Sequence, residues 1–309
     1  MFPKMTKSGT VALAAATVAF CLTASAAEVN QSKRVLKIMT RNMDAGTDLN
    51  LIFAYYPDIP SGVSATLAQV ISTDIPSRAQ RLADEIRTHQ PDFVALQEVT
   101  EWRTGPCGAT TVLYDQLQLL LDTLAARNMQ YAPLAVDTLN VIEAPSLNGC
   151  VRYTDRNALL VRSSLRSGIE VSNVQSYHYA HFLDLSTIGV LGFPPIFHGY
   201  ISADIKAGSD TFRLFNTHLE STYPFDPTGL LQVTQANELI AALNATTLPV
   251  VLVRRLQFQC GSRPRADRQR GPDPRSGVHR RLAALQRTGN RLYVAALFRG
   301  HRQRSGHSK

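Results

Sequence analysis

Residues 91–98, Pro-Asp-Phe-Val-Ala-Leu-Gln-Glu, are the stretch from which the fold of this 309-residue chain can be predicted. The apolar run 93–96 predicts a short buried strand, and polar residues follow at its carboxyl end. A helix precedes it, because Ser77 is a plausible N-cap and apolar residues follow at helical spacing, at Ala79, Leu82, Ala83 and Ile86. This stretch therefore predicts a helix–strand unit with polar groups at the end of the strand.

The same alternation continues on both sides of this unit. Residues 34–40 alternate like a strand and end in a turn-prone sequence at 42–46. Further buried strands are expected at 157–162, 212–219 and 249–253, and amphipathic helices at 113–128 and 232–244. Alternating strands and helices predict a layered α/β fold rather than a helical bundle or a sandwich without helices.

Polar residues gather at the ends of three predicted strands: Asn42 with Asp44, Gln97 with Glu98, and the run 216–220. Side chains at positions i and i+2 of an extended segment face the same way, so Asn42 and Asp44 can point to one spot. Amide and carboxylate oxygens suit Mg²⁺, which binds one or two carboxylates and keeps waters and substrate phosphate. A metal at Asn42, Asp44 and Glu98, with His218 beside it, would assist the hydrolysis of a phosphoester.

Each of these features has an ordinary explanation when it stands alone. A single histidine after a strand is more often a core or surface residue than a catalytic one, and an Asn-x-Asp sequence is usually only a turn. His178 and His181 lie three positions apart and could pair on a metal, but their aromatic-rich surroundings favour a structural role. The functional prediction therefore depends on the order and context of the motifs.

That order, over residues 34–253, resembles the order of motifs in the endonuclease/exonuclease/phosphatase (DNase I-like) superfamily. The matching elements are a strand with Asn-x-Asp, a helix with PDFVALQE, then RNALLVR, FNTHLES, a Gln-rich helix and PVVLV. The most specific are PDFVALQE and, about 120 residues later, NTHLES. The resemblance implies a four-layer α/β sandwich, in which two mixed β-sheets pack face to face and helices lie outside.

The resemblance also implies roles for individual residues. Asn42 and Asp44 match first-strand ligands of metal and phosphate, and Glu98 matches the principal Mg²⁺-binding glutamate. His218 matches the histidine that contacts the phosphate or the leaving oxygen, and Arg156 matches a position that binds substrate phosphate. The implied cofactor is Mg²⁺, with Mn²⁺ as the alternative. The implied partner is a phosphoester substrate (nucleic acid, phospholipid or a small phosphate ester), and a monomer is expected.

The family pattern stops after Val253. In the family, PVVLV is followed by Gly-Asp-Phe-Asn, which orients the attacking water, and a later Asp-His pair supplies the general base; neither motif is present here. Residues 254–260 can be written in codons that read Gly-Asp-Phe-Asn-Ser-Asn one base along, and residues 291–301 give a plausible sequence at the same offset. We interpret residues 254–309 as out of frame, so the fold is expected to be incomplete at its C-terminus.

The charge of the chain separates at the same point. Residues 254–309 hold 15 Lys and Arg, 14 of them Arg, against two Asp, whereas residues 1–253 hold 17 basic and 22 acidic residues. The mildly acidic body argues against tight binding of long nucleic acid. The Gly-, Pro- and Arg-rich tail is not expected to bury a core. If the tail is genuine, the alternative function is a non-catalytic module that binds nucleic acid or another anion through it.

The first residues predict export. Lys4 and Lys7 precede an uncharged apolar run and the small residues 24–26, so residues 1–26 are expected to be a cleaved signal peptide and the protein to be secreted or periplasmic. An uncleaved membrane anchor is the alternative, although the run is short for a span.

Two features of the body depend on this compartment and on burial. In an oxidising compartment Cys107 and Cys150, both in loop-like sequence, can form a disulfide; two unpaired thiols are the alternative. The apolar segment 182–196 is expected to be a pair of buried strands or, alternatively, an exposed lobe that touches lipid or another chain.

Overall fold

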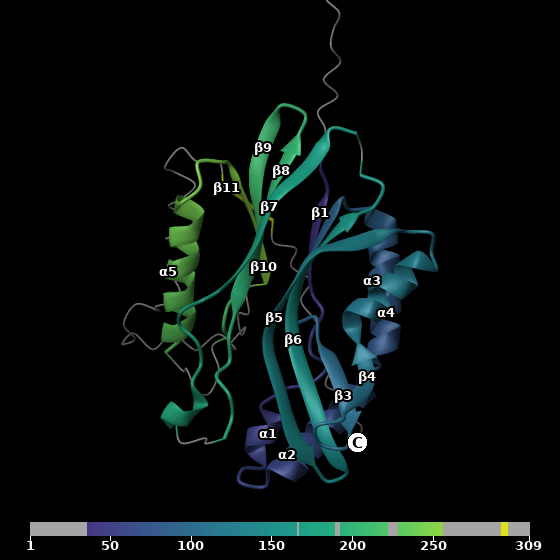
Figure 1. Ribbon diagram of the computed structural model, residues 1–309, viewed down its shortest axis with the longest axis vertical. Coiled ribbons are helices and arrows are strands. Elements are labelled where there is room, and N and C mark those ends of the chain that lie inside the picture. Colours follow the sequence, from purple (N-terminus) through teal and green to yellow (C-terminus); the bar gives the residue numbers. More distant parts are fainter. Residues whose placement is uncertain (1–35, 166, 189–191, 222–227, 256–291, 296–309) are drawn as a thin grey trace, which may run out of the picture. The chain divides into compact units, whose positions relative to one another are not determined.

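Apolar, buried strands form the centre of the first sheet in the computed structural model (Figure 1). β2 (Phe93–Gln97) is buried along its whole length and pairs in parallel with β1 (Ile38–Asn42). The predicted strand at residues 93–96 is therefore confirmed. The structure describes the chain over residues 36–165, 167–188, 192–221, 228–255 and 292–295. The expected signal peptide and most of the expected tail lie outside the described residues.

A long hairpin completes the first sheet. β6 (Gly149–Arg162) pairs along one edge with β5 (Tyr131–Ser146), and along the other with β3 (Glu101–Gly105) and then with β2. β4 (Thr111–Asp115) pairs with β3. The six strands follow the order β1-β2-β6-β3-β4, with β5 paired to β6. The sheet is mixed, because only β1 and β2 are parallel.

The second sheet has five strands in the order β11-β10-β9-β8-β7. β7 (Ile169–His178), β8 (Gly199–Ala207) and β9 (Asp210–His218) are antiparallel neighbours, and β10 (Val250–Arg255) runs parallel to β9. β11 (Leu292–Ala295) pairs in parallel with β10. The sequence did not predict β11, since an open sheet edge can accept a strand through backbone groups alone, whatever side chains that strand carries.

The same capping sequence starts two of the five α-helices in the described part of the chain. The five helices are α1 (Leu51–Ala54), α2 (Ile59–Ser72), α3 (Ile75–His89), α4 (Gln116–Ala125) and α5 (Leu230–Asn244). Before α2 and α3 the sequence Asp-Ile-Pro-Ser recurs, and the Asp58 and Asp74 carboxylates accept hydrogen bonds of 3.2 Å from the N–H groups of Ser61 and Ser77. The prediction that Ser77 is the N-cap of α3 is wrong, because the Asp74 carboxylate already caps the preceding turn.

Three apolar layers hold the sheets and helices together (Figure 1). α3 and α4 pack on one face of the first sheet, for example through Ile86. The opposite face of that sheet packs against the second sheet, where Phe93 and Leu214 belong to one core cluster. α5 covers the outer face of the second sheet, where Leu239 packs with Phe215. The predicted α/β sandwich, two packed mixed sheets with outer helices, is confirmed.

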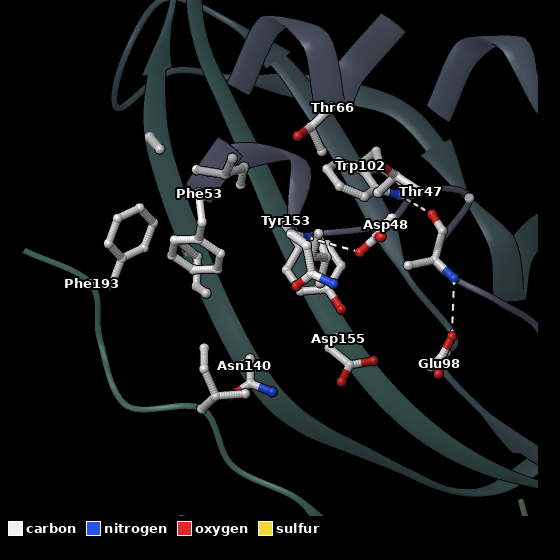
Figure 2. Close-up of a pocket in the computed structure, with 18 of the residues that line it drawn as sticks. Thr47, Asp48, Phe53, Thr66, Glu98, Trp102, Asn140, Tyr153, Asp155 and Phe193 are labelled. Carbon is white, nitrogen blue, oxygen red and sulfur yellow. Dashed lines mark hydrogen bonds between the residues drawn. The ribbon is translucent and has the colours of Figure 1, made fainter. Parts of the chain in front are cut away.

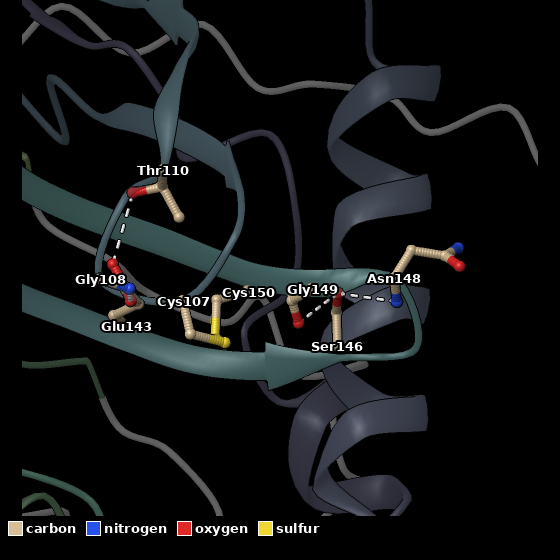
Figure 3. The surroundings of a disulfide bond; sticks show 8 residues. All are labelled: Cys107, Gly108, Thr110, Glu143, Ser146, Asn148, Gly149 and Cys150. Atoms are coloured by element: carbon tan, nitrogen blue, oxygen red, sulfur yellow. Dashed lines mark hydrogen bonds between the residues drawn. A yellow bond between two sulfur atoms is a disulfide. The ribbon is translucent and has the colours of Figure 1, made fainter.

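A disulfide joins the β3–β4 loop to the first sheet (Figure 3). Cys107 lies in that loop, and Cys150 lies on β6 opposite Gly105 in the strand register. The Cα atoms of the two cysteines are 4.9 Å apart although 43 positions separate them in the chain. Glu143 on β5 supports the same loop, because its carboxylate accepts a 2.6 Å hydrogen bond from the N–H of Gly108.

The apolar segment 182–196 is not a pair of strands over its described residues. Leu183 and Ile196 form one antiparallel bridge, and the 3₁₀ helix η1 (Leu185–Ile188) follows Leu183. Leu185 is buried, whereas the side chain of Phe182 is 39% exposed. The prediction of paired strands failed because Pro194 and Pro195 cannot donate ladder hydrogen bonds. No helix within the described residues is long and apolar enough to cross a membrane.

Candidate active site

The turn after β1 holds two of the predicted ligands in a defined conformation. Asn42 Oδ1 accepts a 2.6 Å hydrogen bond from the N–H of Asp44, and Asp44 Oδ1 accepts a 2.9 Å bond from the N–H of Gly46. Asp44 has a φ of +64°, so the chain is no longer extended there and the strand argument for Asn42 and Asp44 does not hold. The two residues are instead joined by consecutive side-chain-to-backbone turns.

Side chains from the outer helices α3 and α4 donate hydrogen bonds to the main chain of this turn. The guanidinium of Arg78 on α3 donates to the carbonyl oxygen of Met43 and, at 2.9 Å, to that of Asp44. Gln116 on α4 donates a 2.8 Å hydrogen bond to the same Asp44 carbonyl. Carbonyl oxygens of an irregular turn need such partners when they are partly buried. The two helices therefore fix the main chain of the turn through its carbonyl groups.

Glu98 and His218 come from different sheets and meet. Glu98 follows β2 with a φ of +52°, and its Oε2 accepts a 3.2 Å hydrogen bond from the N–H of Ala45 in the first turn. Its Oε1 lies 3.4 Å from Nε2 of His218, the last residue of β9. Both side chains are largely buried, 15% exposed for Glu98 and 6% for His218. The predicted metal-binding glutamate and the predicted histidine are therefore neighbours.

A buried amide bridge between the sheets produces this meeting. Asn216 on β9 accepts a 2.6 Å hydrogen bond from the Gln97 side chain on β2. Its own Nδ2 donates to the carbonyl oxygens of Leu96 and Ala158, at 3.0 and 2.9 Å. Buried polar groups are costly unless they are paired, so the bridge specifies how the two sheets align. Glu98 is one residue beyond Gln97, and His218 is two beyond Asn216.

Three further residues join the site: Asp155 on β6, His198 before β8, and Glu220 after β9, of which only Glu220 belongs to a polar cluster identified in the sequence. Nδ1 of His198 lies 3.5 Å from Oε2 of Glu220, and the rings of His198 and His218 are 4.8 Å apart at their centroids. All three residues are less than a tenth exposed. A signal for Asp155 did exist, because an acidic residue in a strand that is otherwise buried is unusual.

The carboxyl group of Asp155 has a pKa well above the usual value for an aspartate. Burial, reinforced by the negative charge of Glu98, raises the pKa of Asp155 to about 8, against opposing hydrogen bonds and the charge of Arg156. One of its oxygens, Oδ1, is buried without a hydrogen-bond partner among the described residues. A cation bound beside this oxygen would stabilise the charged form of Asp155, which burial otherwise disfavours.

These side chains line a pocket of about 580 Å³ (Figure 2). Five of the lining residues are acidic: Asp44, Asp48, Glu98, Asp155 and Glu220. Within the described part of the chain, the lining includes neither Lys nor Arg. A cavity lined by one sign of charge concentrates ions of the opposite sign, so this pocket attracts cations.

The donor set fits Mg²⁺ in its chemistry. Over the described residues, no three His, Cys, Asp or Glu side chains are grouped so that they could hold a metal between them. Mg²⁺ does not need such a cage, because it binds through one or two carboxylates and keeps its waters and substrate phosphate. Glu98 supplies a carboxylate, and Asp155 supplies an oxygen that lacks a partner. Asn42 is not among the lining residues, although its buried side-chain nitrogen has no hydrogen-bond partner among the described residues and is a donor suited to a phosphate oxygen.

Arg156 lies on β6 with its side chain outside the pocket lining. Its guanidinium forms a 2.6 Å ion pair with Asp115 and donates a 2.9 Å hydrogen bond to the carbonyl oxygen of Val99. Arg156 is only 9% exposed. Those contacts link β6 to the start of α4, and the structure does not bring Arg156 together with Glu98 and His218 in the pocket lining.

The strand register shows where the chain departs from the motif pattern. β10 pairs with β9 so that Val253 lies opposite Asn216, Arg254 opposite Thr217 and Arg255 opposite His218. The one-base-shifted reading of residues 254–257, Gly-Asp-Phe-Asn, would place its aspartate at position 255. That position is the one in register with His218.

Neither a family model nor a curated protein matches the chain. Solved structures do match, and they include members of the endonuclease/exonuclease/phosphatase family at low identity. One is the endonuclease/exonuclease/phosphatase from Beutenbergia cavernae, at 21% identity and a TM-score of 0.39, which covers 70% of this chain and 46% of that one.

Two further matches carry more specific descriptions. Humanised TDP2 from D. rerio has 15% identity and a TM-score of 0.35, and covers 70% of this chain and 59% of that one. A mannosyl-6-phosphatase from Bacteroides thetaiotaomicron has 13% identity and a TM-score of 0.37, and covers 71% of this chain and 64% of that one. The chain thus spans between 46% and 64% of the length of these three proteins.

Proposed function

We propose that the chain is an exported, Mg²⁺-dependent phosphoester hydrolase of the endonuclease/exonuclease/phosphatase superfamily, and that its catalysis is impaired by the sequence after Val253. One observation carries the proposal. Glu98 and His218, which belong to two motifs about 120 residues apart, lie 3.4 Å from each other in a pocket with five acidic residues and no lining Lys or Arg within the described residues. Motifs that only resembled the family by chance would have no reason to meet in one pocket.

The residues of the pocket divide the chemistry between them. Glu98, with Asp155 beside it, would hold Mg²⁺, and the bound ion supplies charge neutralisation for the phosphate in the transition state. Asn42 does not line the pocket but shares a turn with the lining residue Asp44, and its side-chain nitrogen, which has no partner within the described residues, would donate to a phosphate oxygen. His218, whose Nε2 lies 3.4 Å from the Glu98 carboxylate, would donate a proton to the leaving oxygen when it is protonated.

What this set lacks are the groups that orient and deprotonate the attacking water in the family, the Gly-Asp-Phe-Asn motif and the later Asp-His pair. The aspartate of the missing Gly-Asp-Phe-Asn motif would stand at position 255, opposite His218 in the strand register, where the chain has Arg255. A positioned general base is worth roughly 10²–10⁴-fold in rate. Losing it while keeping Glu98 and His218 therefore predicts a chain that binds Mg²⁺ and phosphate but hydrolyses slowly.

The direct test compares this chain with a frame-restored version that reads Gly-Asp-Phe-Asn at 254–257. Hydrolysis of bis(4-nitrophenyl) phosphate is measured with Mg²⁺ and with EDTA. The restored protein is expected to turn over roughly 10²–10⁴-fold faster, and only with the metal. If neither protein cleaves the ester and neither binds Mg²⁺ by calorimetry, the proposal is wrong.

Variants in the restored protein locate the site. Glu98→Ala and His218→Ala should each abolish the gain. The matched controls are Glu238→Ala and His181→Ala, which remove a second Glu–His pair, 2.7 Å apart, that does not line the pocket. Those controls should leave turnover within about twofold of the parent, because they touch neither the carboxylates nor the Asn216 bridge. A similar loss in all four variants would mean that the site lies elsewhere.

Export and a monomeric state belong to the same proposal. Residues 1–26 would direct secretion and be removed, so protein recovered from the culture medium or periplasm should begin close to Ala27 by N-terminal sequencing. Light scattering of that material is expected to give the mass of one chain. Intact residues 1–26 in membrane fractions would support the anchor alternative instead.

A non-catalytic anion-binding module is the second candidate, because 14 arginines fall within residues 254–309. In that case the tail is genuine sequence and docks nucleic acid or another anionic surface. Sequencing of the gene across codons 253 and 254 separates the two directly. An intact frame there, without a one-base anomaly, would favour the binding module.

A further inference from the structure

The pocket continues beyond its acidic end into an apolar region (Figure 2). In that view Phe53 and Phe193 lie toward one side, Glu98 lies toward the opposite side, and Tyr153 and Asp155 lie between them. Trp102 and Ile142 also line the pocket, and Figure 2 shows Trp102 near Thr47 and Asp48. One cavity therefore joins carboxylates at one end to aromatic and aliphatic side chains at the other.

Two segments of the chain each place one polar and one less polar side chain in the pocket lining. Tyr153 and Asp155 are two positions apart on β6, so both side chains face the pocket. Ile196 and His198, from the segment before β8, are also two positions apart and also line the pocket. The two ends therefore belong to a single continuous cavity, and a ligand bound at the acidic end would reach the apolar end.

Aromatic side chains pack against one another at two places in the pocket lining. Trp102 is 2% exposed, its indole N–H donates a 2.9 Å hydrogen bond to the carbonyl oxygen of Ala45, and its ring lies 4.9 Å from that of Tyr153. At the outer end the rings of Phe53 on α1 and Phe193 are 5.7 Å apart. Aromatic rings therefore line the pocket from its centre to the Phe53 and Phe193 end, and they present apolar surface to an apolar ligand group.

We infer that the apolar end of the pocket binds an aryl or short alkyl group of the substrate, so that the preferred substrates are phosphoesters of apolar alcohols. The inference rests on the proposed function for the phosphate end alone. A cavity of about 580 Å³ is large for a phosphate with a small polyol, and it is within the range of sites that enclose an organic ligand. The acidic lining, which includes neither Lys nor Arg within the described residues, also disfavours a polyanionic strand.

Binding to the full chain can be measured without turnover, using three probes in Mg²⁺ buffer: 2-naphthyl phosphate, glycerol 3-phosphate and 2-naphthol. Calorimetric titration is expected to give at least about tenfold tighter binding of 2-naphthyl phosphate than of glycerol 3-phosphate, because the naphthyl group removes apolar surface from water. Equal affinity for the two phosphates would overturn the inference.

Two variants act on the apolar end in opposite ways. Ala144→Phe fills the cavity, and Phe193→Ser removes one of its aromatic walls. Both should cut the preference for 2-naphthyl phosphate to less than about threefold while leaving glycerol 3-phosphate binding unchanged. The matched control is Phe182→Ser, on the same segment as Phe193, whose side chain is 39% exposed and does not line the pocket. If the control loses the preference and the pocket variants keep it, the inference is wrong.

The remaining probe separates this inference from the proposed function. Binding of 2-naphthol that is lost in Ala144→Phe supports the apolar site even if neither phosphate binds, an outcome that would remove only the proposed hydrolase. Vesicles of phosphatidylcholine test the other source of an apolar group. Sedimentation with vesicles that requires Phe182, without any binding of the soluble probes, would overturn the pocket assignment in favour of a membrane contact.

Discussion

At the scale of single residues, Asp155 makes the stability of the protein depend on pH. Its pKa is raised to about 8, chiefly by burial, while an aspartate in an unfolded chain has a pKa of about 3.9. Between these values the unfolded state loses the proton and the folded state keeps it. The free energy of unfolding should therefore fall as the pH rises from about 4 to 8, and level off above that range.

The variant Asp155→Asn removes this dependence. The free energy of unfolding of the variant, relative to that of the parent, should increase as the pH rises from about 4 to 8. The total increase should be on the order of 5 kcal/mol at most. Urea unfolding in EDTA at pH 4.5, 6 and 7.5 measures the difference. A difference between variant and parent that stays constant with pH would contradict the assignment of the proton to Asp155.

The site residues were only partly predictable at this scale. Glu98 and His218 could be found because each follows an apolar strand within a specific motif. Asp155 and His198 belong to no such motif, and only the packing of the two sheets brings them into the pocket. Arg156 was predicted from its motif alone, whereas its guanidinium contacts depend on Asp115, a residue 41 positions away.

At the scale of elements, the repeated Asp-Ile-Pro-Ser sequence offers a paired experiment. The pKa of both Asp58 and Asp74 is lowered by the hydrogen bond from Ser61 and Ser77 respectively, so each cap stabilises its helix above the pKa of about 3.9 of an unfolded aspartate. The contribution is lost as the pH falls through the lowered value. Asp58→Ala and Asp74→Ala should each lower the melting temperature by a few degrees at pH 7 and by much less at pH 2.

The conservative variants separate the cap from the charge. Asp58→Asn and Asp74→Asn keep an acceptor that suits an N-cap, so they should retain most of the stability at pH 7 and lose its pH dependence. Thermal scans by circular dichroism provide the measurement. If Asn and Ala variants melt alike, the carboxylates do not cap these helices.

The disulfide is a second feature of this scale. It closes a loop of 43 positions between the β3–β4 connection and β6. Removing it in Cys107→Ser/Cys150→Ser should lower the free energy of unfolding by roughly 2–5 kcal/mol, as for other native disulfides. Urea titrations with and without dithiothreitol check this. The reductant should destabilise the parent and leave the double variant unchanged, and equal sensitivity of both proteins would contradict the prediction.

Element prediction succeeded where a local pattern was strong. The strand at 93–96 and the helix that became α3 have clear apolar periodicity and flanking signals. The long hairpin of β5 and β6 has mixed composition, because many of its β5 side chains are exposed, so periodicity could not reveal it. The sequence also did not reveal α1, which has four residues and none buried, or α2. The Asp-Ile-Pro-Ser sequence at Asp58, which is the same as at Asp74, was the available signal for α2.

At the scale of the whole molecule, opposite charges occupy different parts of the chain. Residues 1–253 hold 22 acidic and 17 basic residues, whereas residues 254–309 hold 15 basic residues and two Asp. Full-length protein should therefore bind duplex DNA weakly and with an affinity that falls steeply with salt, whether or not the tail is functional. A chain that ends at residue 255 should show no measurable binding at the same salt concentration. Fluorescence anisotropy at two salt concentrations tests this, and binding by the shortened chain would place the contact in the body.

The alignment of the two sheets depends on buried amides that connect them, among them Asn216 on β9. If one sheet slid past the other by one residue, about 3.3 Å, the apolar side chains between them would exchange one set of apolar contacts for another. Apolar contacts alone therefore specify the alignment only weakly. The same slide would strip Asn216 of its contacts with Gln97, Leu96 and Ala158 together. Substitutions among the surrounding apolar residues can therefore weaken the protein without changing the 3.4 Å approach of Glu98 to His218.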